Sequence, residues 1–167
     1  MNRKEDARQD FEKAIDLQPD YAFALFNRGI MNMNDKKNED AYADFSDAIA
    51  ADSGYTDAYL NRSVVLQNMN RIDEALNDCN TAIALEPDYP MPHYNRGMLL
   101  MQMKRYEAAI SDFTVLIQAN TDLPNAHYQR GIAEYYLGKK ELACGDILEA
   151  SKLNVPNAKA MFDKFCH

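Results

Sequence analysis

The sequence predicts an all-α chain built from repeated helix pairs, and three observations support this prediction. Similar residues recur every 34 positions along the 167-residue chain. Within each period, apolar residues lie three and four apart, which is the spacing of an amphipathic helix. No segment alternates apolar and polar residues as a half-buried strand does. Repeats of this length are typical of solenoids, in which each unit buries its apolar face against its neighbours.

The period is carried by three recurring features. One is a tripeptide, Asn27-Arg28-Gly29, which returns as Asn61-Arg62-Ser63, Asn95-Arg96-Gly97 and Gln129-Arg130-Gly131. Another is an alanine, which recurs at Ala7, Ala41, Ala75, Ala109 and Ala143. The third is an aspartate, which recurs at Asp10, Asp44, Asp78, Asp112 and Asp146. Several positions that keep one period indicate a repeated structural unit rather than chance.

Each period is expected to hold two helices joined by a tight turn. Residues 94–103 are mostly good helix formers, and residues 106–119 place apolar side chains at helical spacing. Lys104 and Arg105 lie between the two segments and fit a short helix–helix turn. Asp122 is a candidate N-cap for the helix that follows, and Gly138 is a candidate C-cap for the end of that helix.

The register of the period divides the chain, which is expected to be a single domain over residues 1–167. The ranges are a half-repeat at 1–21, full repeats at 22–55, 56–89, 90–123 and 124–157, and a capping helix at 158–167. In the half-repeat, Phe11 and Ile15 are expected to pack on a first helix that this sequence does not contain. Either the sequence is a fragment of a longer array, or another molecule covers that face.

The repeat resembles the tetratricopeptide repeat (TPR) family. The family's first small position holds Gly29, Gly97 and Gly131, with Ser63 replacing glycine once. Its second small position holds the recurring alanines, its aromatic position holds Phe45 and Phe113, and its proline position holds Pro19 and Pro87. The resemblance implies a right-handed solenoid of antiparallel helix pairs with a concave binding groove. It also implies a protein-interaction module rather than an enzyme.

By the same resemblance, the first helix of each repeat lines the groove. The expected partner-binding residues are Phe23, Phe26, Asn27, Leu60, Asn61, Met91, Tyr94, Asn95, Met98, Met101, Tyr128, Gln129 and Tyr135. The amides in this set can bond a peptide backbone, because an amide both donates and accepts hydrogen bonds. The alternative is that they bond neighbouring helices. No expected groove position is basic, which argues against a site for a partner's terminal carboxylate.

A second ladder is predicted to be structural. Arginine recurs at a position that is usually apolar in the family, and an inward-facing arginine needs an acidic partner. The expected ion pairs join Arg28, Arg62, Arg96 and Arg130 to Asp44, Asp78, Asp112 and Asp146. The other interpretation is a stripe that binds anions. Because each arginine has a recurring acid of its own, internal pairs that set the helix register are favoured.

Composition restricts the classes of function further. The formal net charge of −8 disfavours nucleic acid and anionic membranes as partners. The three cysteines have no metal-type spacing, so neither a metal nor a cofactor is expected, and a reduced compartment such as the cytoplasm is favoured. The localisation stays open, because a fragment need not include a signal peptide of the whole protein.

The sequence therefore predicts a module that binds a peptide or protein segment in its groove without catalysis. Two alternatives remain. One is an assembly protein that self-associates through its N-terminal half-repeat. The other is the interaction domain of a longer multidomain protein.

Overall fold

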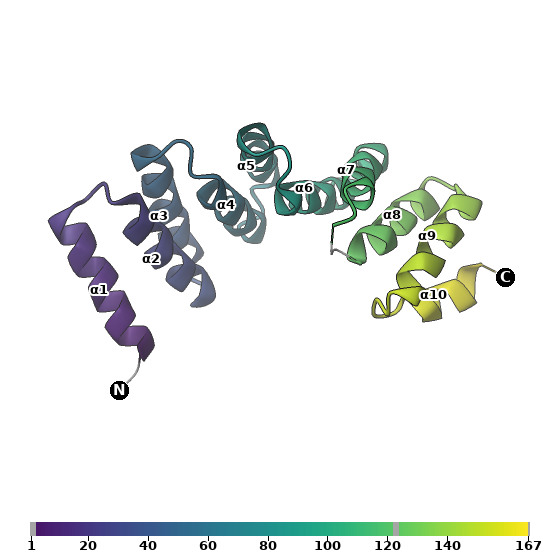
Figure 1. Cartoon of the computed structure of the whole chain (residues 1–167), viewed down its shortest axis with the longest axis horizontal. Coiled ribbons are helices and arrows are strands. Elements are labelled where there is room, and N and C mark those ends of the chain that lie inside the picture. Colours follow the sequence, from purple (N-terminus) through teal and green to yellow (C-terminus); the bar gives the residue numbers. More distant parts are fainter. Residues whose placement is uncertain (1–2, 122–123, 167) are drawn as a thin grey trace. The chain divides into compact units, whose positions relative to one another are not determined.

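The computed structural model describes residues 3–121 and 124–166, and over these residues it contains ten helices and no strand. Figure 1 shows the helices following one another along the chain. They are α1 (Arg3–Leu17), α2 (Ala22–Asn34), α3 (Asn38–Ala51), α4 (Thr56–Asn68), α5 (Ile72–Leu85), α6 (Pro90–Gln102), α7 (Tyr106–Gln118), α8 (Asn125–Tyr136), α9 (Lys140–Lys152) and α10 (Ala158–Phe165). The all-α helical-repeat prediction is confirmed. In the described part of the chain, no helix is both long and apolar enough to cross a membrane.

The helices group into two compact units, one ending at Asp88 and the other beginning at Tyr89. In the first unit, α1 packs on α2, α2 on α3, α3 on α4, and α4 on α5. In the second unit, α6 packs on α7, α7 on α8, α8 on α9, and α9 on α10. Each helix thus contacts mainly its neighbours in sequence, as expected of a repeat protein. The expectation of one domain over the whole chain stays a prediction.

The turn between the two helices of each pair has one recurring backbone conformation. One residue in each turn has a positive φ, and these residues are Lys36, Asn70, Lys104 and Gly138. The left-handed conformation reverses the chain within a short turn, so the second helix packs back on the first. Gly138 has a φ of 74° and directly follows Leu137, the C-cap of α8. It is therefore the residue just past the helix end, where glycine is preferred.

Two other predicted boundaries lie near the C-terminal part. Asp122, the predicted N-cap, lies outside the described residues, and α8 begins at Asn125 directly after Pro124. The predicted capping segment forms α10, which is preceded by Asn157 with a φ of 66°. The capping helix packs on α9.

The core of each pair forms where a small residue of the first helix meets a side chain of the second. A Cβ atom on Gly29 would lie 2.7 Å from Cε1 of Phe45, and one on Gly97 would lie 2.7 Å from Cε1 of Phe113. The second helices contribute alanines that are buried, namely Ala41, Ala48, Ala75, Ala82, Ala109, Ala143 and Ala150. The small positions of the period thus bring the two helices into close contact.

The cysteines differ from expectation. Cys144 of α9 and Cys166, at the C-cap of α10, form a disulfide with their Cα atoms 5.6 Å apart. Cys79 is buried and takes no part in it. The sequence analysis, which favoured a reduced compartment, did not predict this pairing. The disulfide ties the capping helix to the last full repeat.

Candidate functional site

The predicted groove residues lie on the first helices of the four pairs. In the first unit, these helices are α2 and α4, which contact each other. In the second unit, they are α6 and α8, which also contact each other. The structure thus brings the predicted residues together in two sets, one on each unit.

Most of these side chains are half-buried. This group comprises Phe26, Asn27, Asn61, Met91, Tyr94, Asn95, Met98, Met101, Tyr128 and Gln129. Phe23 and Tyr135 are more open, at 53% and 39% exposed. Leu60 is only 8% exposed, so it packs inside the first unit and does not belong to the surface.

The aromatic residues of α2 divide between the core and the surface. The ring of Phe26 lies 5.7 Å from that of Phe45 and 4.8 Å from that of Tyr55, measured between centroids. Phe23 instead lies 6.3 Å from Phe11 and 6.0 Å from Tyr21, in a cluster that remains partly open to solvent. Phe26 therefore supports the fold, and Phe23 is the more exposed of the two rings.

The amide ladder is partly engaged by the protein itself. The Nδ2 atom of Asn27 donates to the carbonyl of Phe23 at 2.7 Å, and that of Asn61 donates to the carbonyl of Asp57 at 2.8 Å. A carbonyl only accepts, so each amide must turn its NH₂ group toward its own helix. Among the described residues, Oδ1 of Asn27 and of Asn61 receives no hydrogen bond. In the first unit, the two amide oxygens are thus left as hydrogen-bond acceptors.

In the second unit, a groove amide joins two helices. Gln129 of α8 shares a side-chain hydrogen bond with Tyr94 of α6. Burial raises the pKa of the Tyr94 phenol, and the hydrogen bond with Gln129 acts in the opposite direction. The ring of Tyr94 also lies 6.1 Å from that of Phe113. Tyr94 is thus held in place before any partner binds.

Each recurring arginine bonds the aspartate sixteen residues further along the chain. The shortest N–O distances are 2.6 Å for Arg28–Asp44, 2.7 Å for Arg62–Asp78, 2.6 Å for Arg96–Asp112 and 2.6 Å for Arg130–Asp146. All four aspartates are buried, while the arginines are partly buried. The hydrogen bond with the paired aspartate raises the guanidinium pKa of Arg28, Arg62 and Arg130. The positive charge of these three arginines is therefore stabilised by the paired aspartate.

Three of the aspartates bond a further side chain of the first helix. Asn32 donates to Asp44 at 2.8 Å, and Nδ1 of His93 and of His127 lies 3.1 and 2.9 Å from Oδ1 of Asp112 and Asp146, respectively. These contacts use the carboxylate oxygens within the repeat. They favour the structural interpretation of the ladder over an anion-binding stripe.

Two of the arginines also reach the preceding repeat. Nη1 of Arg62 donates to the hydroxyl of Ser46 at 3.1 Å, and Nη1 of Arg130 donates to that of Thr114 at 3.1 Å. The acceptor lies sixteen residues before the arginine in both cases. One arginine thus links the second helices of two consecutive repeats, a role that the sequence analysis did not predict.

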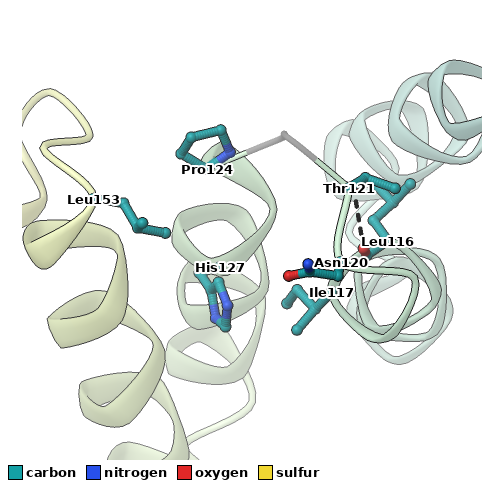
Figure 2. Close-up of a pocket in the computed structure, with 7 residues that line it drawn as sticks. All are labelled: Leu116, Ile117, Asn120, Thr121, Pro124, His127 and Leu153. Carbon is teal, nitrogen blue, oxygen red and sulfur yellow. Dashed lines mark hydrogen bonds between the residues drawn. The ribbon is translucent and has the colours of Figure 1, made fainter.

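Figure 2 shows a pocket in the second unit, between the end of α7, the start of α8 and the end of α9. Its volume is about 150 Å³, and Ile117, His127 and Leu153 are among its lining residues. Small-molecule sites usually measure roughly 300–1,000 Å³. The pocket is thus smaller than a typical small-molecule site. Among the described residues, no three His, Cys, Asp or Glu side chains are grouped to hold a metal ion.

Two other features were missed by sequence reasoning. Glu134 is 7% exposed, and its Oε2 atom has no hydrogen-bond partner in the described structure. Tyr106 and Tyr136 stack with their ring centroids 5.0 Å apart and their planes within 10°. A comparison between repeats could have found both, because Leu66 and Leu100 are equivalent to Glu134, and Asn68 and Gln102 are equivalent to Tyr136.

Comparison with known families gives one match. The tetratricopeptide repeat model matches residues 1–56 and 60–124, which is more than half of the chain. No curated protein sequence matches the chain.

Several solved structures share the fold. The crystal structure of MamA is similar with a TM-score of 0.83 and 20% identity, over 91% of this chain and 89% of that one. YrrB, described as a TPR protein with an unusual peptide-binding site, gives a TM-score of 0.83 and 21% identity, over 98% and 84% of the two chains. The first TPR of Spaghetti (RPAP3), bound to the HSP90 peptide SRMEEVD, is similar with a TM-score of 0.68 and 20% identity. The match covers 70% of this chain and 93% of that one. At these identities the similarity shows the fold.

Proposed function

The chain belongs to the tetratricopeptide repeat family, and from this premise we propose that it binds a segment of a partner protein along its first-helix faces. Its fold is that of a protein-interaction module. Among the similar structures, one is bound to a peptide and another is described as having a peptide-binding site, which supports this class of function. Catalysis is not part of the proposal.

The observation that carries the proposal is the surface formed by α6 and α8. Tyr94 is held by Gln129, and Met91, Met98 and Met101 lie half-buried on the same helix. A pre-positioned aromatic ring binds at a low cost in conformational entropy. Methionine side chains adapt to apolar partners of different shapes. The surface therefore suits an apolar side chain of a bound segment.

The first unit supports the same mode of binding through its amides. The Oδ1 atoms of Asn27 and Asn61 are available to accept hydrogen bonds, and the backbone N–H groups of an extended peptide are donors. Backbone contacts of this kind hold a peptide without selecting its side chains. They complement the apolar contacts that supply most of the affinity.

The charge of the chain indicates the kind of segment. None of the predicted groove residues is basic, and the net charge is −8. Complementary charge speeds association and excludes partners of the same sign. The proposed ligand of these faces is therefore an apolar or mixed segment with basic flanks.

The test is selection of binding peptides from a random library on the whole chain, followed by titration calorimetry. Tyr94→Ala and Asn95→Ala are expected to weaken the selected peptide about tenfold or more, as central contacts do. Gln118→Ala, an exposed amide on α7, is the matched control and should leave affinity unchanged. Equal affinity of all three variants would contradict the proposal.

Self-association is the second candidate function, and the cluster at α1 and α2 favours it. Leu17, the last residue of α1, is 81% exposed, and the rings of Phe11, Tyr21 and Phe23 form a cluster that is partly open to solvent. Sedimentation velocity over a concentration series tests it. If the native chain forms a dimer and Phe11→Asp does not, self-association becomes the leading function. If the native chain is a monomer at every concentration, self-association is excluded.

A further inference from the structure

Four aromatic rings form a continuous row in the second unit. Tyr106 stacks on Tyr136 at 5.0 Å, Tyr136 meets Tyr135 edge-on at 6.1 Å, and Tyr135 lies 5.2 Å from Phe165. The rings come from the start of α7, the end of α8 and the end of α10. Tyr136 is 62% exposed and Tyr135 is 39% exposed. The row therefore offers aromatic surface to solvent.

The repeats themselves show that the fold does not require the stacked pair. The position of Tyr106 is taken by Asn38 and Ile72 in the earlier repeats, and that of Tyr136 by Asn34, Asn68 and Gln102. These repeats form the same helix pairs with the same turns. The tyrosine pair is thus a local addition, and exposed aromatic rings are enriched where proteins bind partners.

Basic residues lie close to the row in the sequence. Lys104 and Arg105 directly precede Tyr106, and Lys139 and Lys140 follow Tyr136 by three and four residues. All four are exposed, and none forms an ion pair or side-chain hydrogen bond within the described structure. In residues 104–107, 139–141 and 163–164, five residues are basic and three are acidic. This region is locally positive in a chain whose net charge is −8.

The starts of α7 and α9 add to this local field. Arg105 and Lys139 are the N-cap residues of these helices, and neither makes a side-chain cap bond. A helix N-terminus favours a nearby negative charge. The basic side chains, the two helix starts and the exposed rings thus coincide at one edge of the second unit.

We propose that this tyrosine edge, formed by Tyr106, Tyr135, Tyr136 and Phe165 with Lys104, Arg105, Lys139 and Lys140, binds a short acidic segment of a partner protein. The segment carries an aromatic or proline side chain that packs on the exposed face of Tyr136. Its carboxylates pair with the four basic residues. This surface differs from the first-helix faces of the proposed function, for which a partner with basic flanks is expected.

A single-stranded nucleic acid also combines negative charge with stacking rings, but the charge distribution favours the peptide. Electrostatic interactions between exposed charges are largely screened beyond about 8 Å at physiological salt. A short acidic segment senses mainly the local positive region. A nucleic-acid strand carries a charge at every phosphate and extends over the acidic remainder of the chain.

The experiment is fluorescence anisotropy on the full chain with a labelled glutamate-rich peptide that contains one central tryptophan. Tyr136→Ala and the double variant Lys104→Glu/Arg105→Glu are each expected to weaken binding about tenfold or more. Binding should also weaken as NaCl is raised. The same peptide with alanine in place of tryptophan should bind more weakly, and a short oligothymidine should not bind.

The matched control is Lys36→Glu/Lys37→Glu. These lysines occupy the same turn in the first unit, Lys36 and Lys104 share a φ of 59°, and the change in net charge is identical. The control variant should leave the affinity for the peptide unchanged. If the two double variants weaken binding equally, the effect is due to net charge alone and the proposal is overturned. Tyr136-dependent binding of oligothymidine, at the affinity of the peptide, would also overturn it. Circular dichroism and the Tm of each variant show that the fold is kept. Asn95→Ala should not change the affinity for this acidic peptide. The test of the tyrosine edge can therefore fail or succeed independently of the test of the first-helix faces.

Discussion

Arg62 and Asp78 are joined by two hydrogen bonds, from Nε to Oδ2 at 2.8 Å and from Nη2 to Oδ1 at 2.7 Å. The remaining guanidinium nitrogen, Nη1, donates to Ser46 of the preceding repeat. One side chain of α4 thus holds both α3 and α5. Such bidentate, charge-assisted pairs are geometrically specific as well as strong. We interpret Arg62, and Arg130 in the second unit, as residues that set the position of one helix pair on the next within each unit.

Replacement of Arg62 by methionine tests this interpretation. The variant leaves the buried carboxylate of Asp78 without its partner, so the free energy of unfolding should fall by about 3–5 kcal/mol in urea denaturation. Lys152→Met is the control, because Lys152 pairs with Glu149 on the exposed surface and should change stability little. If the two variants unfold at the same urea concentration, the pair does not stabilise the fold. The double variant Arg62→Met/Asp78→Leu should recover much of the loss.

The 34-residue period is sufficient to predict the helix pairs because each pair must bury the same small and aromatic positions. The period also predicts which arginine pairs with which aspartate, because each 34-residue repeat has the same geometry as the next. It does not predict contacts that depart from the period. Cys144 lies on α9 and Cys166 is the C-cap of α10, and their separation of 22 residues carries no recognisable signal in the sequence. The groove residues are likewise predicted only as a face, and the burial of Leu60 depends on packing within the unit.

Alanine is expected to lower the stability of the chain at Gly97, where the helices approach closely, and to raise it at Gly145, where space is open. Gly97→Ala places a Cβ 2.7 Å from the buried ring of Phe113, so the helices must move apart. The cost should be about 1–3 kcal/mol, as for other overpacked sites. Gly145→Ala, inside α9, meets no atom within 4 Å and should raise stability by up to about 1 kcal/mol, because alanine favours the helix. Urea denaturation measures both, and a loss of stability in each would contradict the steric explanation.

The disulfide predicts that a reductant destabilises the chain. The bond closes a loop with a sequence separation of 22, for which the loss of loop entropy in the unfolded state is about 3 kcal/mol. Dithiothreitol should therefore lower the urea midpoint of the native sequence and leave that of Cys166→Ser unchanged. Thiol titration in denaturant should find one reactive thiol, that of Cys79, before reduction. Three thiols in the purified, unreduced protein would contradict the structure.

Glu134 is a buried carboxyl group whose environment opposes its charge. Burial raises its pKa above 4.5, the negative charge of Asp146 raises it further, and Arg130 and Lys139 act in the opposite direction. Its equivalents Leu66 and Leu100 show that the repeat accepts an apolar side chain at this position. The last repeat therefore carries a carboxyl group where the two repeats before it carry leucine.

The raised pKa fixes the sign of a pH effect on stability. Because the folded chain holds the proton of Glu134 more tightly than the unfolded chain does, the contribution to stability is fully present below pH 4.5 and is lost as the pH rises through the folded pKa. Glu134→Leu should therefore be more stable than the native sequence at pH 7, by about 1–3 kcal/mol, since it removes a buried group without a partner. Glu134→Gln, which keeps the shape, should show a stability difference from the native sequence that grows between pH 4.5 and 7. Tm measured across this range decides the matter. A difference that stays constant with pH would mean that the pKa of Glu134 is the same in the folded and the unfolded chain.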